Sequence, residues 1–157
     1  LELLRANIPD VTFTADIIVG FPGETEEMFR TTENYLRQSR FLFAHIFPYS
    51  DRAGTEASER TDKIGEAVKK DRAARLKAVM LEVRESVLTD FLESVRPVLV
   101  EKIENGLAVG YTDNYIETHT DVRGYPAVTE NSFITVRLTG IADDLSHMTA
   151  EIVKEDA

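Results

Sequence analysis

The sequence contains no cysteine among its 157 residues. This absence excludes disulfides, zinc–thiolate sites and thiolate ligands for an iron–sulfur cluster within this stretch. Long apolar runs are also missing, so we expect no membrane span, and no secretory or transit signal opens the sequence. The chain begins with Leu1 rather than Met, already inside a helix-like pattern, and we expect it to be a segment of a longer protein.

Basic residues are scarce and unevenly distributed. Lys and Arg number 18 against 28 Asp and Glu, which gives a formal net charge of −10. Residues 101–157 hold eleven acidic residues and only four basic ones, a net of −7; the basic residues are Lys102, Arg123, Arg137 and Lys154. A nucleic-acid surface usually shows clustered basic residues, and this region does not.

The densest basic segment lies between residues 69 and 77. It carries Lys69, Lys70, Arg72, Arg75 and Lys77. Acidic residues are interspersed with them, which is typical of a solvated helix face, and contact with RNA is the alternative interpretation.

The stretch from Thr12 to Glu27, TFTADIIVGFPGETEE, predicts a strand, a tight turn and the start of a helix. Alternation places only apolar side chains on one strand face. The other face is mostly polar, which suits a wall that faces a ligand, and carries Thr12, Thr14, Asp16 and Ile18. A phosphate-binding loop is excluded, because the Walker residues are missing and glutamates at the helix N-terminus would repel an anion.

A second strand is expected from Phe41 to Tyr49, after a helix from Thr25 to about Arg40. Strand, helix and strand form the βαβ unit of a parallel sheet or barrel. The polar loop Ser50–Arg60 follows the second strand, at the end where α/β barrels place their ligand-binding loops. A simple connector is the other interpretation of this loop.

The character of the sequence changes at Pro97. Before it, an apolar stripe predicts one long helix from residue 61 or 62 to about Val95. After it, short β-prone runs and the hairpin signal Asn105-Gly106 predict a small antiparallel β-barrel. The expected fold is therefore α/β, followed by a long helix and a barrel, with boundaries at residues 1–60, 61–96 and 97–157.

The sequence offers no metal site and no catalytic constellation. The three histidines, His45, His119 and His147, are scattered and lack carboxylates at metal-ligand spacing. We therefore assign no catalytic and no metal-binding residue.

The motif DIIVGFPGET, followed by HIFPYSDRAGTEA, resembles the second half of the radical S-adenosylmethionine methylthiotransferases. The resemblance implies the C-terminal part of a partial (β/α) barrel whose strand ends line an S-adenosylmethionine pocket. The residues that it implies for cofactor binding are Asp16, Ile18, Val19, Gly20, Phe47, Pro48 and Tyr49.

The region after Pro97 resembles a TRAM domain, an OB-like RNA-binding barrel, through VLVE and the stretch GYTDNY. In the same family, Arg in the YSxRxGT motif is typical of members that act on tRNA. The residues that the resemblance implies for substrate binding are Arg52, Thr55, Tyr111, Asn114, Tyr115, Arg123 and Arg137.

Together these resemblances imply a cytoplasmic transferase that adds a methylthio group to a modified adenosine near the tRNA anticodon. The HIFPYS version is most similar to the branch that acts on N6-threonylcarbamoyladenosine. The family uses S-adenosylmethionine and two 4Fe-4S clusters, so the cluster ligands are expected in a missing N-terminal half, and this cysteine-free chain is expected to be inactive alone. The alternatives are a methylthiotransferase for a ribosomal protein, or a non-catalytic module that binds RNA or protein.

Overall fold

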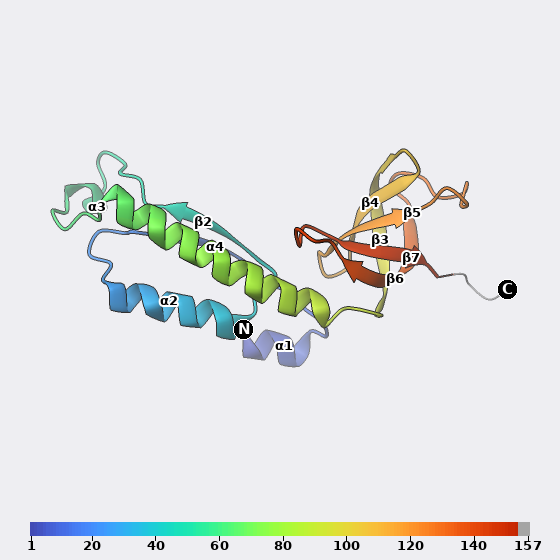
Figure 1. Ribbon diagram of the computed structural model, residues 1–157, viewed down its shortest axis with the longest axis horizontal. Coiled ribbons are helices and arrows are strands. Elements are labelled where there is room, and N and C mark those ends of the chain that lie inside the picture. The colour runs from blue at the N-terminus through green and yellow to red at the C-terminus, as the bar shows by residue number, and fades with distance from the viewer. Residues whose placement is uncertain (154–157) are drawn as a thin grey trace. The chain divides into compact units, whose positions relative to one another are not determined.

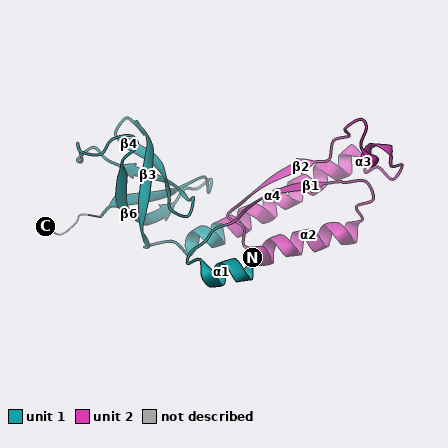
Figure 2. Cartoon of the chain, turned by 180° about the vertical axis from the view of Figure 1, so that it is seen from behind, with its two compact units in different colours: residues 1–12, 85–157 teal, residues 13–84 magenta. Residues whose placement is uncertain are grey.

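The structure is a computed structural model that describes residues 1–153, and these residues form two compact units (Figures 1 and 2). One unit comprises residues 13–84. Of the described residues, the other unit comprises 1–12 and 85–153. The helix that was expected to link two domains contributes to both units, and the domain boundaries at residues 60 and 96 stay a prediction.

The unit of residues 13–84 is built on a two-stranded parallel sheet. Strand β1 (Thr14–Val19) pairs in parallel with β2 (Phe43–Pro48), and helix α2 (Glu26–Ser39) connects them. Both strands run toward the short helix α3 (Glu56–Glu59), as Figure 2 shows. The predicted βαβ arrangement is confirmed here, whereas the wider (β/α) barrel remains a prediction.

Local sequence explains where α2 begins and ends. The Thr25 hydroxyl accepts the Met28 backbone N–H at 3.2 Å, so the residue acts as an N-cap. Glutamates in the first turn are stabilised by the positive end of the helix dipole. The helix stops at Arg40, which adopts a left-handed conformation with φ 49°.

Helix α4 (Glu66–Thr89) is shorter than the sequence predicted at both ends. Beyond Thr89 the chain turns through residues 90–94, where Glu93 has a φ of 64° and donates its N–H to Leu138 at 2.8 Å. Strand pairing with the barrel therefore begins before residue 97.

The prediction that Pro97 ends the helix is wrong, because Pro97 lies inside strand β3 (Val95–Glu104). It pairs with Thr135 on the neighbouring strand. Proline has no N–H to donate to its partner strand. The Thr135 carbonyl needs no such donor, because it accepts the Val153 N–H at 2.9 Å.

The barrel closes in the order β3-β4-β5-β7-β6, which is consistent with a small OB-like barrel. Its remaining strands are β4 (Leu107–Thr112), β5 (Glu117–Asp121), β6 (Phe133–Ile141) and β7 (Met148–Ile152). The sequence predicted an antiparallel barrel, but β5 and β7 pair in parallel. Strand β4 pairs with one edge of β5, and β7 pairs with the other edge, which closes the barrel.

The expected hairpin between β3 and β4 is confirmed. Asn105 and Gly106 both have positive φ, 53° and 81°, as a two-residue turn of the I′ type requires. The strands β3 and β4 therefore start pairing directly at Glu104 and Leu107.

A short helix, α1 (Glu2–Asn7), opens the chain and leads into a segment that is bound to the barrel. The Asn114 side chain donates to the Asp10 carbonyl at 3.1 Å, and the Thr12 hydroxyl donates to the Asn114 carbonyl at 2.6 Å. Arg96 forms ion pairs with Asp10 and Asp113. No helix in the described part of the chain combines the length and apolar character needed to cross a membrane.

Candidate functional site

A cleft of about 660 Å³ opens at the carboxyl ends of β1 and β2. Its wall combines both strand ends with the following loops: Asp16, Ile18, Phe21, Phe47, Pro48, Tyr49, Ser50, Arg52, Thr55 and Ala57. The structure thus brings together most of the residues that the sequence assigned to cofactor binding, along with two assigned to substrate binding.

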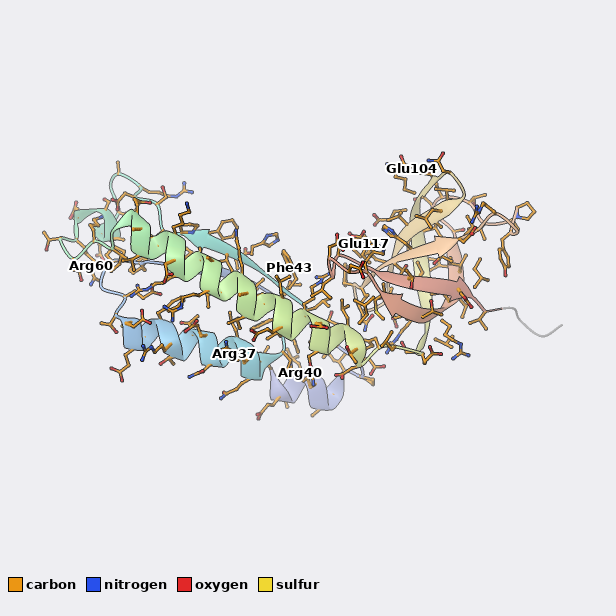
Figure 3. All side chains as sticks on the ribbon, viewed as in Figure 1. Arg37, Arg40, Phe43, Arg60, Glu104 and Glu117 are labelled. Atoms are coloured by element: carbon orange, nitrogen blue, oxygen red, sulfur yellow. The ribbon has the colours of Figure 1, made fainter. Side chains whose placement is uncertain are left out.

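The strand register explains why these side chains share one wall. Asp16 lies opposite His45, and Ile18 lies opposite Phe47, so both strands present the same face. Ile18 and Phe47 are about half exposed despite their apolar character. Phe43 projects from the start of β2 on that face (Figure 3), and its ring meets His45 edge to face at 4.6 Å. Apolar side chains left open to solvent on a sheet face mark a binding surface.

The loop after β2 is held in place by Lys63. Its ammonium donates to the carbonyls of Ala57 and Ser58 at 2.8 and 3.0 Å, and it pairs with the Asp51 carboxylate. Lys63 thereby lowers the pKa of Asp51. Tyr49 donates its hydroxyl to Asp51 at 3.0 Å, and desolvation together with this bond raises the pKa of Tyr49.

Thr55 and Arg52 differ in what their side chains do. The Thr55 hydroxyl donates to the Arg52 carbonyl at 2.8 Å and accepts the Ser58 N–H at 3.2 Å, so it caps α3. The exposed Arg52 guanidinium makes no hydrogen bond or ion pair with any residue in the range 1–153. Arg52 therefore supplies a cation that is available to a ligand, whereas Thr55 shapes the loop.

Val19 and Gly20 lie behind the cleft wall. The Val19 side chain is fully buried in the core, and its carbonyl accepts the Tyr49 N–H at 2.8 Å. Gly20 has a φ of 71°, and a Cβ at this position would overlap the side chain of Lys69. Side-chain bulk at Gly20 would therefore meet helix α4 before it met a ligand, and these two residues do not contribute side chains to the cleft.

Three of the five basic residues between 69 and 77 are engaged within the fold. Lys69 and Arg72 are buried. Arg75 pairs with Glu26 and Glu33 of α2 at 3.0 and 2.7 Å, which raises its pKa and lowers that of Glu26. The solvated face that the sequence suggested is thus limited to the exposed Lys70 and Lys77.

The barrel residues of the predicted substrate site also differ in their surroundings. Tyr115 is 77% exposed in a turn with φ 64°. Tyr111 is half-buried and donates to Glu117 at 3.1 Å. Asn114 is buried, and its side chain binds the Thr112 hydroxyl and the Asp10 carbonyl. Of these three residues, Tyr115 presents the most open surface.

The basic residues Lys102, Arg123 and Arg137 each have a polar partner within the fold. Arg123 forms an ion pair with Asp121, which lowers the pKa of Asp121 to about 2. Lys102 pairs with Glu104 at 2.6 Å, and Arg137 donates to the Glu93 carbonyl at 3.0 Å. Lys154 lies outside the described residues.

A stacked pair of histidines on the barrel was not predicted from the sequence. The rings of His119 and His147 lie 3.5 Å apart with an interplanar angle of 19°. His119 Nε2 lies 3.2 Å from Glu117, and His147 Nδ1 lies 2.8 Å from the Ser146 hydroxyl. Burial and the neighbouring His119 lower the pKa of His147. Within residues 1–153, no group of three or more potential ligands is placed to hold a metal ion.

The cleft is compatible with an adenosyl ligand in size and lining. Small-molecule sites typically measure about 300–1,000 Å³ and are mainly apolar with a few polar groups. Here Ile18, Phe47 and Pro48 provide apolar surface, while Asp16 and Arg52 provide opposite charges. The chain cannot ligate an iron–sulfur cluster through thiolates, since it has no cysteine.

Comparison with known proteins identifies relatives over most of the chain, although no family model matches. A threonylcarbamoyladenosine tRNA methylthiotransferase of Bacillus subtilis is 38% identical over 122 residues, which are 74% of this chain and 27% of the relative. A tRNA-2-methylthio-N(6)-dimethylallyladenosine synthase of Acetivibrio thermocellus is 45% identical over 100 residues, 64% of this chain and 21% of the relative. The synthase of that name from Pelobacter propionicus is 37% identical over 154 residues, 89% of this chain and 34% of the relative. The chain, which spans at most about a third of these relatives, belongs to the radical S-adenosylmethionine methylthiotransferase family.

Proposed function

We propose that this chain is the C-terminal part of a methylthiotransferase that modifies N6-threonylcarbamoyladenosine near the tRNA anticodon. The observation that carries the proposal is the cleft at the ends of β1 and β2, which brings Phe21 of the GFPGE motif together with Tyr49, Arg52 and Thr55 of the YSDRAGT motif. Relatives named as tRNA methylthiotransferases over most of the chain support the same activity.

In this proposal, residues 1–60 complete a (β/α) barrel with upstream strands, and the cleft holds the adenosyl part of S-adenosylmethionine. Ile18, Phe47 and Pro48 contact the adenine, while the Asp16 carboxylate faces the cationic end of the cofactor. The bound cofactor supplies an adenosyl radical and a methyl group. The cluster ligands come from a region outside this chain, since the chain has no cysteine.

The substrate contacts in this proposal begin with Arg52 at the cleft. Its guanidinium is suited to a phosphate or carboxylate oxygen, and the threonylcarbamoyl group carries a carboxylate. The TRAM-like barrel offers Tyr115 for stacking with a base. The paired side chains of Arg123 and Arg137 contribute less attraction to phosphate.

The second candidate substrate is dimethylallyladenosine, which is favoured by the names of several relatives. Arg52 argues against a ribosomal-protein substrate, since that branch usually carries Glu at this position of the motif. A non-catalytic binding module is the candidate from another class. A CxxxCxxC motif encoded upstream would favour the enzyme over that module.

The test uses the complete protein that carries this chain, expressed in a host that lacks methylthiolated adenosines. Mass spectrometry of digested tRNA should reveal a methylthio group on threonylcarbamoyladenosine, and the empty vector is the control. Modification of dimethylallyladenosine alone would support the second candidate, and unmodified tRNA would overturn both. The 157-residue chain on its own should bind no iron and cleave no S-adenosylmethionine.

A further inference from the structure

Two buried cations of α4 reach the ends of both sheet strands. The Arg72 side chain is 5% exposed, and its Nη1 donates to the Glu24 carbonyl at 2.9 Å and to Glu24 Oε2 at 2.6 Å. The same carboxylate oxygen accepts the Gly20 N–H at 2.7 Å. Arg72 is therefore connected through Glu24 to the first residue after β1.

Lys69 makes the corresponding contact with β2. Its Nζ donates to the Tyr49 carbonyl at 3.0 Å, directly after the end of β2, and to Glu66 at 2.8 Å. Its alkyl chain fills the space beside Gly20, where a Cβ would overlap it. Lys69 thus contacts the residues that follow both strands.

These contacts are costly as a means of stabilisation alone. Arg72 Nε is buried without a hydrogen-bond partner, and a buried donor left unpaired destabilises a fold. Buried ion pairs are also often no more stabilising than apolar residues of the same volume. What they provide is a fixed geometry between α4 and the two turns.

We propose that Arg72 and Lys69 are positioning residues that fix the shape of the cofactor cleft from behind its wall. Arg72 acts through Glu24 on the turn that leads to Phe21, and Lys69 acts on Tyr49; both Phe21 and Tyr49 line the cleft. The rings of these two residues meet at 5.2 Å, so a shift of either turn changes the cleft wall. The identity of the ligand in this inference rests on the proposed function, whereas the contacts of Arg72 and Lys69 do not.

The first test measures amide hydrogen exchange in the 157-residue chain. Arg72→Met should speed exchange of the turn 20–24 by about tenfold or more, because the Gly20 N–H loses a fixed acceptor. Lys69→Met should have the same effect at residues 49–51. Lys70→Met is the matched control, since Lys70 is exposed and adjacent on the same helix. If Arg72→Met fails to fold, Arg72→Lys keeps the charge on a shorter side chain that cannot place a donor where Nη1 lies, and it should speed exchange at the same turn.

The second test measures binding of S-adenosylhomocysteine to the complete protein by calorimetry. Arg72→Met and Lys69→Met should each weaken binding by about tenfold, whereas Lys70→Met should not change it. Glu24→Gln should weaken binding by a similar factor, and adding it to Arg72→Met should bring little further loss, because both act through one contact.

The two tests separate this inference from the function on which it rests. If the unaltered protein binds no S-adenosylhomocysteine, the proposed function fails, and the exchange rates alone decide on the positioning role. If Arg72→Met and Lys69→Met exchange and bind as Lys70→Met does, the positioning role is overturned.

Discussion

Two buried cations of residues 13–84 and two exposed cations of the β-barrel are used in different ways. Lys69 and Arg72 are buried; besides Glu66, Lys69 binds the Tyr49 carbonyl, 20 residues away along the chain, and Arg72 binds Glu24, 48 residues away. Lys102 and Arg123 are exposed and bind carboxylates two residues away. Pairing between distant segments fixes one element on another, whereas local pairing mainly neutralises charge. Lys69 and Arg72 therefore fix elements of the fold, whereas Lys102 and Arg123 mainly offset acidity.

Truncation of a buried apolar side chain should destabilise the two regions to a similar extent, and this loss is the reference for the comparison. Leu76 in α4 and Leu138 in β6 are both fully buried. We expect Leu76→Ala and Leu138→Ala each to reduce the free energy of unfolding by about 2–5 kcal/mol. Hydrogen exchange should locate each loss within the unit that carries the substitution. If Leu138→Ala speeds hydrogen exchange in α2 as strongly as in β6, the prediction that each loss stays within its own unit is wrong.

Glycine replacement should affect the barrel more than the sheet unit. A Cβ at Gly110 would overlap the backbone carbonyl of Leu99, which cannot move without breaking the pairing of β3 and β4. A Cβ at Gly20 would meet only the side chain of Lys69, although its φ of 71° adds strain. We expect Gly110→Ala to cost about 3 kcal/mol and Gly20→Ala about 1–2 kcal/mol, measured by urea unfolding.

The control for this pair is Gly124→Ala. No atom lies within 4 Å of a Cβ added at Gly124, so its effect should stay within about 0.5 kcal/mol. Equal losses for Gly110→Ala and Gly20→Ala would show that the Leu99 carbonyl moves as easily as the Lys69 side chain.

A smaller difference should appear when pH is lowered, and it should be confined to the barrel. The pKa of His147 is lowered by burial and by His119, while Glu117 and Asp144 act in the opposite direction. The folded state therefore binds protons more weakly than the unfolded state, and stability is lost as pH falls below about 6.5. Because His147 is partly solvated, we expect a loss below about 1 kcal/mol between pH 7.5 and 5.5.

His147→Asn should reduce this pH dependence, since Asn keeps a polar group beside Ser146 without titrating. The measurement is urea unfolding followed by a barrel-specific signal at both pH values. A barrel that gains stability on acidification would mean that Glu117 and Asp144 outweigh the stacked rings.

The sequence predicted the local elements well because their signals are local. The alternation in Thr14–Val19, the helix start near Thr25 and the turn at Asn105-Gly106 depend on signals within a few residues, and each is observed. The family resemblance assigned Asp16 and Phe47 to the cofactor and Arg52 to the substrate, and in the structure the parallel pairing of β1 and β2 brings these three residues to one cleft.

Features that depend on distant partners could not be predicted in this way. Arg72 resembles any other charged helix residue until the fold brings Glu24, 48 residues away in sequence, against it. Asn114 looked like a loop residue for RNA, yet Asp10 lies 104 residues away and accepts its side-chain hydrogen bond. The helix end was misplaced for the same reason, since pairing with β6 makes Pro97 part of a strand.

The smallest expected effect is on the salt dependence of tRNA binding. It compares Arg52 at the cleft directly with Arg123 on the barrel. Each Lys or Arg that contacts a phosphate adds about 0.9 to the slope of log affinity against log salt. The Arg52 guanidinium has no polar partner among residues 1–153, so Arg52→Gln in the complete protein should lower that slope by about one. Arg123 is already neutralised by Asp121, so Arg123→Gln should leave the slope almost unchanged. Affinities measured between 50 and about 200 mM salt give both slopes. A large decrease of this slope with Arg123→Gln would show that tRNA displaces Asp121 from Arg123, and that Arg123 contacts the substrate.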